Sequence, residues 1–172
     1  MNNIIKARKM KLHIISTEII KPSSPTPSHL KTYNLSLIDQ TMNSNNFIPL
    51  LLFYPNTENR SFHAKTLDMK NSLSQILTKY YPFAGRYAKA APAHVDCNDD
   101  GAEFLAGSID TTLSDFLQNS QHEDLDQFFP YRQVWFNSDR KTESDQVMIP
   151  LAVQINHFEC GGVAVAVSLS TR

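Results

Sequence analysis

A histidine and an aspartate four residues apart form the clearest acid–base pair in this sequence. His122-Glu-Asp-Leu-Asp126 has the spacing H-x-x-x-D, which could supply a general base with a carboxylate beside it. The surrounding segment, Asn119 to Gln127, is polar and acidic, and no buried strand precedes it. A general base must be held within about 3 Å of the proton that it removes, on a rigid support. We therefore interpret the segment as a solvated loop and not as a catalytic site.

The other nucleophiles and bases show no catalytic or metal-binding pattern. His157 precedes a Cys-Gly-Gly turn, where we expect a hydrogen-bonded or solvent-facing side chain, with a rescuing general base as the alternative. Cys160 has no neighbouring base that would activate a thiol, so we expect it to pack. Gly161-Gly162 matches neither phosphate-loop pattern. Four histidines are isolated and lack ligand spacing: His13, His29, His63 and His94. We name no catalytic residue and no metal site.

Composition excludes several classes of function. The chain has 172 residues, 41% of them hydrophobic and 19% charged, with a formal net charge of −1. This balance gives no electrostatic basis for binding nucleic acid or an anionic membrane, and no apolar stretch is long enough for a membrane span. Two cysteines make no disulfide framework and fit a reducing compartment, so we expect a cytoplasmic protein. Residues 1–11 are expected to form a disordered or frayed extension, and residues 12–172 a single domain.

The first third of the domain predicts two strands. Leu12 to Ile20 contains four Ile and one Thr, which are β-branched, and runs into the proline-rich connection Lys21 to Ser28, which favours extended chain. Phe47 to Tyr54 is an apolar run of the kind found in strands covered on both faces. Because Pro49 has no amide proton, we expect pairing to begin after it.

The next segment is predicted to be a helix, because its apolar residues no longer alternate as in a strand. Met69, Leu73, Ile76, Leu77 and Tyr80 recur at spacings of three and four residues, which places them on one side of a helix. Pro82 is expected to end it. Gly85, in the exit that follows, is expected to take a backbone conformation that other residues resist.

The last part of the chain mixes strands with a short helix. Asp-Gly within Asn98 to Gly101 predicts a β-hairpin between Ala93–Cys97 and Ala102–Ala106. Thr111 to Gln118 indicates a Thr-capped helix with Leu113, Phe116 and Leu117 inward. Val147 to Phe158 and Val163 to Leu169 are expected to be the final strands, and they are apolar enough to need a cover. We predict an α/β domain with a mixed sheet and helices.

Five separated segments, in order, resemble the plant BAHD family of acyl-CoA-dependent acyltransferases. Within that family the residues of these segments most resemble those of the vinorine-synthase-like, alkaloid-modifying members. The resemblance runs from about Leu12 to Ser170. The segments are Lys21-Pro-Ser-Ser-Pro-Thr-Pro, Leu35-Ser-Leu-Ile-Asp-Gln40, Tyr80-Tyr-Pro-Phe-Ala-Gly-Arg86, Val95-Asp-Cys-Asn-x-x-Gly-Ala-x-Phe104 and Gln154-Ile-Asn-x-Phe-x-Cys-Gly-Gly162.

The resemblance implies a chloramphenicol-acetyltransferase-like fold of two halves, of which this chain resembles the N-terminal half. It also implies acyl-CoA as co-substrate, no bound cofactor, and a histidine base in an H-x-x-x-D motif at the end of the last strand. That histidine is expected at position 171, where the sequence has Thr171, and the family's D-F-G-W-G segment does not occur. We therefore expect a chain truncated before the catalytic motif and inactive by itself. Asp39 and Arg86 lie in family segments and are candidate substrate-binding residues, with an Asp-capped turn and a structural ion pair as alternatives.

Three hypotheses about function remain open. The first is transfer of an acyl group, most simply acetyl, from acyl-CoA to a hydroxyl or amine of a plant specialised metabolite such as an alkaloid, once a second half completes the site. The second is a non-catalytic partner that pairs with a full-length relative or with a separately encoded second half. The third is the product of an incomplete gene model.

Overall fold

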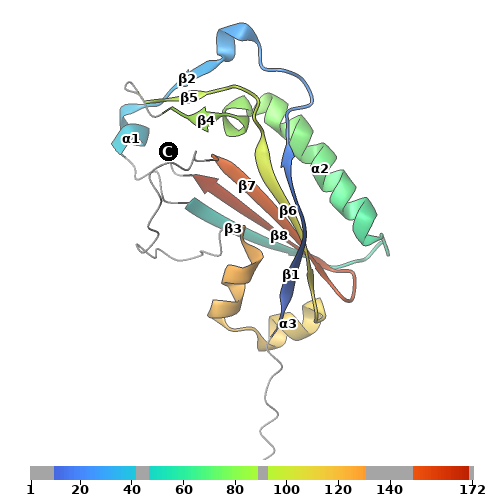
Figure 1. Ribbon diagram of the computed structural model, residues 1–172. Helices are drawn as coiled ribbons and strands as arrows, with labels where there is room; N and C mark the ends of the chain where they lie inside the picture. Colours follow the sequence, from blue (N-terminus) through green and yellow to red (C-terminus); the bar gives the residue numbers. More distant parts are fainter. Residues whose placement is uncertain (1–9, 42–46, 89–92, 131–148, 171–172) are drawn as a thin grey trace, which may run out of the picture.

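Alternating apolar residues build a five-stranded mixed sheet at the centre of the protein (Figure 1). The computed structural model describes residues 10–41, 47–88, 93–130 and 149–170. In spatial order the strands are β1 (Leu12–Ile20), β6 (Ala102–Ile109), β7 (Leu151–Phe158), β8 (Val163–Ser170) and β3 (Phe47–Tyr54). β6 and β7 run parallel, whereas the other neighbouring pairs are antiparallel. The predicted α/β domain with a mixed sheet is confirmed.

Helices pack on both faces of this sheet. The helices are α1 (Leu37–Thr41), α2 (Phe62–Lys79), α3 (Leu113–Asn119) and the 3-10 helices η1 (Ser28–Leu30), η2 (Tyr81–Ala84) and η3 (His122–Phe128). On one face, α2 buries Leu73 and Leu77. On the other, Phe116 of α3 and Phe128 of η3 are buried. The strands alternate between these two cores, as a period of two residues requires.

A second, smaller sheet lies beyond one end of the large one (Figure 1). Its antiparallel strands are β2 (Thr32–Asn34), β5 (His94–Asp96) and β4 (Arg86–Tyr87). A small core of Leu35, Val95 and Cys97 lies against it. The chain passes between the sheets four times, and two of these connections matter below: the proline-rich segment joins β1 to β2, and residues 97–101 join β5 to β6.

The predicted β-hairpin around Asn98–Gly101 is wrong. The residues before it form β5 in the small sheet, and the residues after it form β6 in the large sheet. The turn does use left-handed backbone, with φ of 62° at Asp99 and 93° at Gly101. A Cβ at Gly101 would lie 2.5 Å from the carbonyl oxygen of Ile20. The Asp-Gly signal therefore marks a change of sheet instead of a two-residue loop.

Strand β3 differs from its prediction in two ways. Pairing begins at Phe47, and Pro49 lies opposite Ser168 within the ladder. Proline is tolerated because β3 is an edge strand, with one side of its backbone free of ladder bonds. The strand is also covered on one face only: its burial alternates, and Ile48, Leu50, Leu52 and Tyr54 are exposed.

Gly85 does not need a left-handed conformation, contrary to prediction. Its backbone is extended, with φ of −92°. Glycine is required for space instead, because a Cβ would lie 2.5 Å from the carbonyl oxygen of Asp96 in the neighbouring strand. In α3, Thr112 caps the helix as predicted for a Thr cap, and Leu113 and Phe116 are buried, but Leu117 is exposed because it lies on the solvent side of this short helix.

Met10 is buried against the core that α3 and η3 cover, so residues 10 and 11 do not belong to the frayed extension predicted for residues 1–11. The backbone amide of Lys11 donates to Asp110 Oδ1 at 2.7 Å. The expected frayed extension otherwise falls on residues 1–9, outside the described residues, as do Val147 and Met148 of the predicted strand Val147–Phe158. Among the described helices, none combines the length and apolar character needed to cross a bilayer.

Candidate functional site

The H-x-x-x-D pair lies on the surface. The segment predicted as a loop forms the 3-10 helix η3, which a reciprocal capping box between Gln121 and Asp124 begins. His122 is exposed at the start of this helix. A base in that position has no enclosed site in which to meet a substrate, so the geometry supports the non-catalytic interpretation of His122 and Asp126.

His157 is buried within the sheet and not solvent-facing. Only 5% of it is exposed, and its Nε2 lies 3.0 Å from the hydroxyl of Thr66 on α2. The ring also packs against Phe62 at a tilt of 45°, with centroids 3.7 Å apart. Burial, with a smaller contribution from the charge of Lys65, lowers the pKa of His157 to about 4. The imidazole is therefore neutral at pH 7 and serves to join β7 to α2.

The Cys-Gly-Gly turn between β7 and β8 is fixed by a lysine on α2. Lys65 Nζ donates to Asn56 Oδ1 and to the carbonyl oxygen of Gly161, both at 2.6 Å. Burial lowers the pKa of Lys65. Gly161 has φ of 81°, and a Cβ there would lie 2.3 Å from Asn56 Nδ2. Cys160 is exposed, contrary to the expected packing, and its Sγ accepts from the Leu113 amide at 3.4 Å.

A cavity of about 390 Å³ lies beside this turn, between the first half of α2 and the strands β3, β7 and β8. Its floor includes Ile155, Val163 and Val165. Its rim carries an ion pair between Arg60 and Asp68. Charges of both signs border the apolar floor, so the cavity shows no preference for a ligand of one charge. Among the described residues, no three His, Cys, Asp or Glu side chains gather as a metal site.

Asp39, predicted as a substrate-binding candidate, caps the short helix α1. Its Oδ2 accepts from the backbone amide of Ser36 at 3.1 Å and from the Ser36 hydroxyl at 2.7 Å. The Ser36 hydroxyl lies 3.2 Å from the Asp39 amide in return. This is the reciprocal arrangement of a capping box, so the alternative of an Asp-capped turn describes the local geometry.

We expect Asp39→Ala to lower the free energy of unfolding by about 1 kcal/mol, because it removes both capping hydrogen bonds. Urea unfolding of the purified chain measures this change. Asp39→Asn is the matched control, since asparagine keeps an acceptor for the Ser36 amide and should lose less. Unchanged stability in Asp39→Ala would contradict the capping role.

Arg86, the second candidate, joins the small sheet to the start of β6. Its Nη1 donates to the carbonyl oxygens of Gly85 and Gly101, each at 2.7 Å. Its Nε lies 3.9 Å from Asp100 Oδ2. The structure does not bring Arg86 together with Asp39: one holds the β4 region to the β5–β6 connection, and the other caps α1. Substrate binding by either residue stays a prediction.

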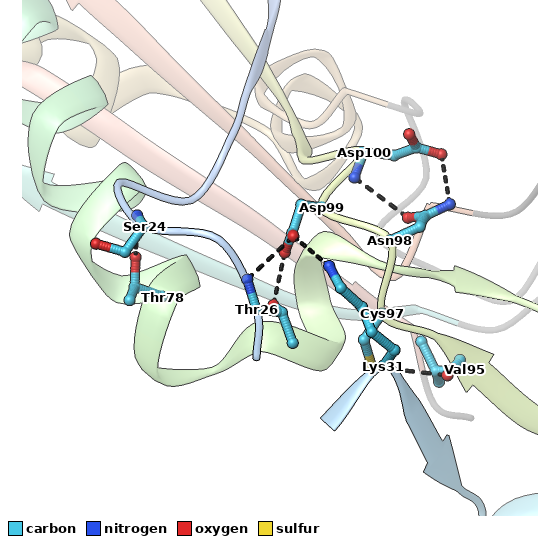
Figure 2. A network of polar contacts seen from close by, with 9 residues as sticks. All are labelled: Ser24, Thr26, Lys31, Thr78, Val95, Cys97, Asn98, Asp99 and Asp100. Atoms are coloured by element: carbon cyan, nitrogen blue, oxygen red, sulfur yellow. Dashed lines mark hydrogen bonds and ion pairs between the residues drawn. The ribbon is translucent and has the colours of Figure 1, made fainter. Parts of the chain in front are cut away.

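A carboxylate that sequence reasoning passed over joins the two inter-sheet connections (Figure 2). Asp99 accepts from the Thr26 amide at 3.0 Å, from the Thr26 hydroxyl at 2.6 Å and from Lys31 Nζ at 2.6 Å. Burial acts to raise the pKa of Asp99, but the hydrogen bonds from Lys31 and Thr26 outweigh it and hold the pKa below its ordinary value. The adjacent Ser24 is bound through its amide to the Thr78 hydroxyl of α2 at 3.2 Å. The two family segments that begin at Lys21 and at Val95 therefore interact with each other.

A buried amide pair explains the Gln-Ile-Asn segment. Gln154 Nε2 donates to Asn156 Oδ1 at 2.7 Å, and Asn156 Nδ2 donates to the Phe128 carbonyl at 3.1 Å. Both side chains are almost fully buried on β7, where they hold the end of η3 against the sheet. Alternation along β7 could have identified two amides on one buried face. In sum, the described part of the chain provides a scaffold and a cavity with an apolar floor. One histidine–aspartate contact does form, between His94 Nε2 and Asp96 Oδ1 at 3.1 Å in the small sheet, but neither residue lines the cavity.

Comparisons with known proteins agree with this architecture. The family model described as the Transferase family matches residues 10–172. Stemmadenine O-acetyltransferase from Catharanthus roseus is 40% identical over 163 residues, which is 94% of this chain and 37% of that protein. Vinorine synthase from Rauvolfia serpentina is 41% identical over 166 residues, covering 92% of this chain and 37% of that protein. The crystal structure of vinorine synthase superimposes with a TM-score of 0.79 at 40% identity, over 93% of this chain and 38% of the other. The chain thus spans little more than a third of the length of these relatives.

Proposed function

This chain belongs to the transferase family of plant BAHD acyltransferases, and from that membership we propose that it forms the N-terminal scaffold of an acyl-CoA-dependent acyltransferase. The reaction we propose is transfer of an acetyl group from acetyl-CoA to a hydroxyl of a plant specialised metabolite such as an alkaloid. The observation that carries the proposal is 40% identity to stemmadenine O-acetyltransferase over 94% of this chain. A cytoplasmic location is part of the same proposal.

The proposed chemistry follows the family pattern. A histidine base removes the proton from the acceptor hydroxyl, the oxygen attacks the thioester carbonyl, and the C–S bond breaks as the proton passes from the histidine to the departing CoA thiolate. His122 and His157 do not suit this role, the first being surface-exposed and the second buried against Thr66. The position expected for the histidine holds Thr171, which lies outside the described residues. We therefore propose that these 172 residues support catalysis without supplying the base.

A chimera tests the proposal. In it, this chain replaces the segment of stemmadenine O-acetyltransferase that it matches, and the rest of that enzyme supplies its own residues. We expect the chimera to acetylate stemmadenine from acetyl-CoA, within about a hundredfold of the parent rate, since small misplacements of a catalytic group can cost that much. The readout is acetylated product by mass spectrometry. A folded, soluble chimera without turnover would contradict the scaffold role.

The chain alone is the matched control. We expect it to turn over acetyl-CoA at least about 10²-fold more slowly than the chimera, because loss of a general base typically has that cost. Turnover by the chain alone that His122→Ala abolishes would show that the surface H-x-x-x-D pair is catalytic after all, and would overturn our assignment of His122.

A second candidate function is that of a non-catalytic partner, which pairs with a full-length relative or a separate second half. The specific observation in its favour is the row of exposed apolar residues on β3, which suits contact with protein better than with water. An active chimera favours the first candidate. An inactive chimera, together with specific capture of a full-length relative by the chain, favours the second.

A further inference from the structure

The two central strands β7 and β8 carry polar side chains into a buried core. Gln154 and Asn156 lie on β7 and Ser168 lies on β8, and they are 1%, 0% and 3% exposed. Alternation directs all three toward the core that α3 and η3 cover, because Ile155 of β7 and Val167 of β8 pack in the other core. A buried polar group without a hydrogen bond costs stability, so the partners of each side chain decide what this region can hold.

Backbone carbonyls fix the orientation of both amide side chains. Asn156 Nδ2 donates to the Phe128 carbonyl at 3.1 Å and to the Ala164 carbonyl at 3.5 Å. Asn156 must therefore present its Oδ1 to Gln154. Gln154 Nε2 donates to that oxygen at 2.7 Å and to the Gln127 carbonyl at 3.3 Å. Both amide protons of Gln154 are thereby used, and Gln154 Oε1 is the acceptor that remains.

Gln154 and Ser168 each keep an unused polar atom. In the part of the chain that the structure describes, Gln154 Oε1 accepts no hydrogen bond and the Ser168 hydroxyl makes none. Gln154 pairs with Ala166 across the ladder, so Ser168, two residues further along β8, is its diagonal neighbour on the same face. Diagonal neighbours lie about 7–8 Å apart, a span that a glutamine side chain and one bridging molecule can cover.

We propose that Gln154 Oε1 and the Ser168 hydroxyl bind one buried water molecule between β7 and β8. Water supplies what both groups lack: it donates a proton to the Gln154 oxygen and forms its second hydrogen bond with the Ser168 hydroxyl. An apolar ligand could satisfy neither group. A charged ligand would be costly to bury among the phenylalanine and alanine side chains of this core.

The water completes a polar network that joins three elements. The network runs from the Gln127 carbonyl of η3 through Gln154 of β7 to Ser168 of β8. A fully satisfied buried network makes a core rigid. Ser168 lies three residues before position 171, where the family resemblance places the catalytic histidine. The network therefore fixes β8 where it approaches that position, and the water site does not depend on the proposed acyl transfer.

Ser168→Ala tests the bridge by the sign of its effect on the Tm of the purified chain. We expect the Tm to fall by about 3 °C or more, because Gln154 Oε1 loses a partner in a buried site. Without the water, the Ser168 hydroxyl would be a buried polar group with no bond at all, and its removal would leave the Tm unchanged or raise it. That second result would overturn the proposal.

A second background separates a bridge from an effect of Ser168 alone. In Gln154→Leu the water has lost its other partner, so adding Ser168→Ala should no longer lower the Tm. The same loss in both backgrounds would contradict a bridge. Ser74→Ala is the matched control, because the Ser74 hydroxyl donates directly to the Lys21 carbonyl at 2.8 Å and should cost the same in both backgrounds.

A high-resolution crystal structure of the parent chain decides the matter if Gln154→Leu does not fold. A solvent peak within hydrogen-bond distance of both Gln154 Oε1 and Ser168 Oγ would support the bridge. Well-defined side chains without such a peak between them would overturn it.

Discussion

Replacing Asp99 by alanine is expected to lower the free energy of unfolding by about 3 kcal/mol, one of the two largest single-residue effects that we predict. The carboxylate accepts three hydrogen bonds, two of them from Thr26 and one from Lys31. Thr26 is only 6% exposed, so its amide and hydroxyl would be left without their acceptor in a nearly dry site. Alanine would also be strained at the φ of 62° that Asp99 adopts.

Two control variants separate these causes. Asp99→Asn tolerates the left-handed backbone and keeps one acceptor oxygen, so it should lose roughly half as much stability. Asp99→Gly removes the carboxylate but relieves the backbone, and should resemble Asp99→Ala if hydrogen bonding dominates. Urea unfolding of the parent and the three variants, fitted with one shared m-value, gives the change in the free energy of unfolding for each variant. A change below about 1 kcal/mol for Asp99→Ala would mean that the two inter-sheet connections are held by other contacts.

Acidification is expected to destabilise the protein through His157. Its pKa is about 4 in the folded state against an ordinary value of 6.5, so the unfolded chain binds the proton more readily. Stability from this residue is complete above pH 6.5 and is lost as the pH falls toward 4. Between pH 7 and pH 5 we expect a loss of about 2 kcal/mol, and about 3 kcal/mol in all by pH 4.

The comparison with His157→Gln isolates this effect from the other titrating groups. Glutamine can still hydrogen-bond the Thr66 hydroxyl but does not titrate, so the stability of His157→Gln should fall by about 2 kcal/mol less than that of the parent between pH 7 and pH 5. Thermal or urea unfolding at half-unit pH steps from 7 to 5 gives the slope. Parallel profiles for the two proteins would show that the imidazole is protonated in the folded state without cost, contrary to its burial against Thr66 and Phe62.

The spacing of apolar residues along the sequence predicted helices and strands well wherever that spacing alone determines the secondary structure. Val163 to Leu169 was predicted as a strand that needs a cover, and it forms most of β8, between β7 and β3, with residues buried in both cores. The same reasoning failed for β3. An apolar run shows that both faces of a strand avoid water, but it does not show which other elements cover each face. The Asp-Gly turn near Gly101 was misassigned for a related reason: left-handed residues fix local direction, not the sheet that the chain joins next.

The site was less predictable than the fold because its contacts are long-range. Asp99 binds residues 73 and 68 positions away in sequence, and no local pattern links them. Arg86 and Asp39 were identified as family positions, yet only the structure reveals that one bonds to backbone carbonyls and the other to Ser36. His157 resembled a surface hairpin residue until its neighbour on α2, Thr66, was known.

The strand order of the large sheet delays its completion during biosynthesis. Both outer pairings of the large sheet join distant parts of the chain: Leu12 lies opposite Ile109, and Phe47 opposite Ser170. Such high contact order slows folding, because each pairing must first close a long loop. At typical translation rates, β3 leaves the ribosome on the order of 10 s before its partner β8 has been made. During that interval an eight-residue strand that is apolar on both faces has no partner, and holdase chaperones that bind extended apolar segments should therefore recognise the nascent chain at Phe47–Tyr54.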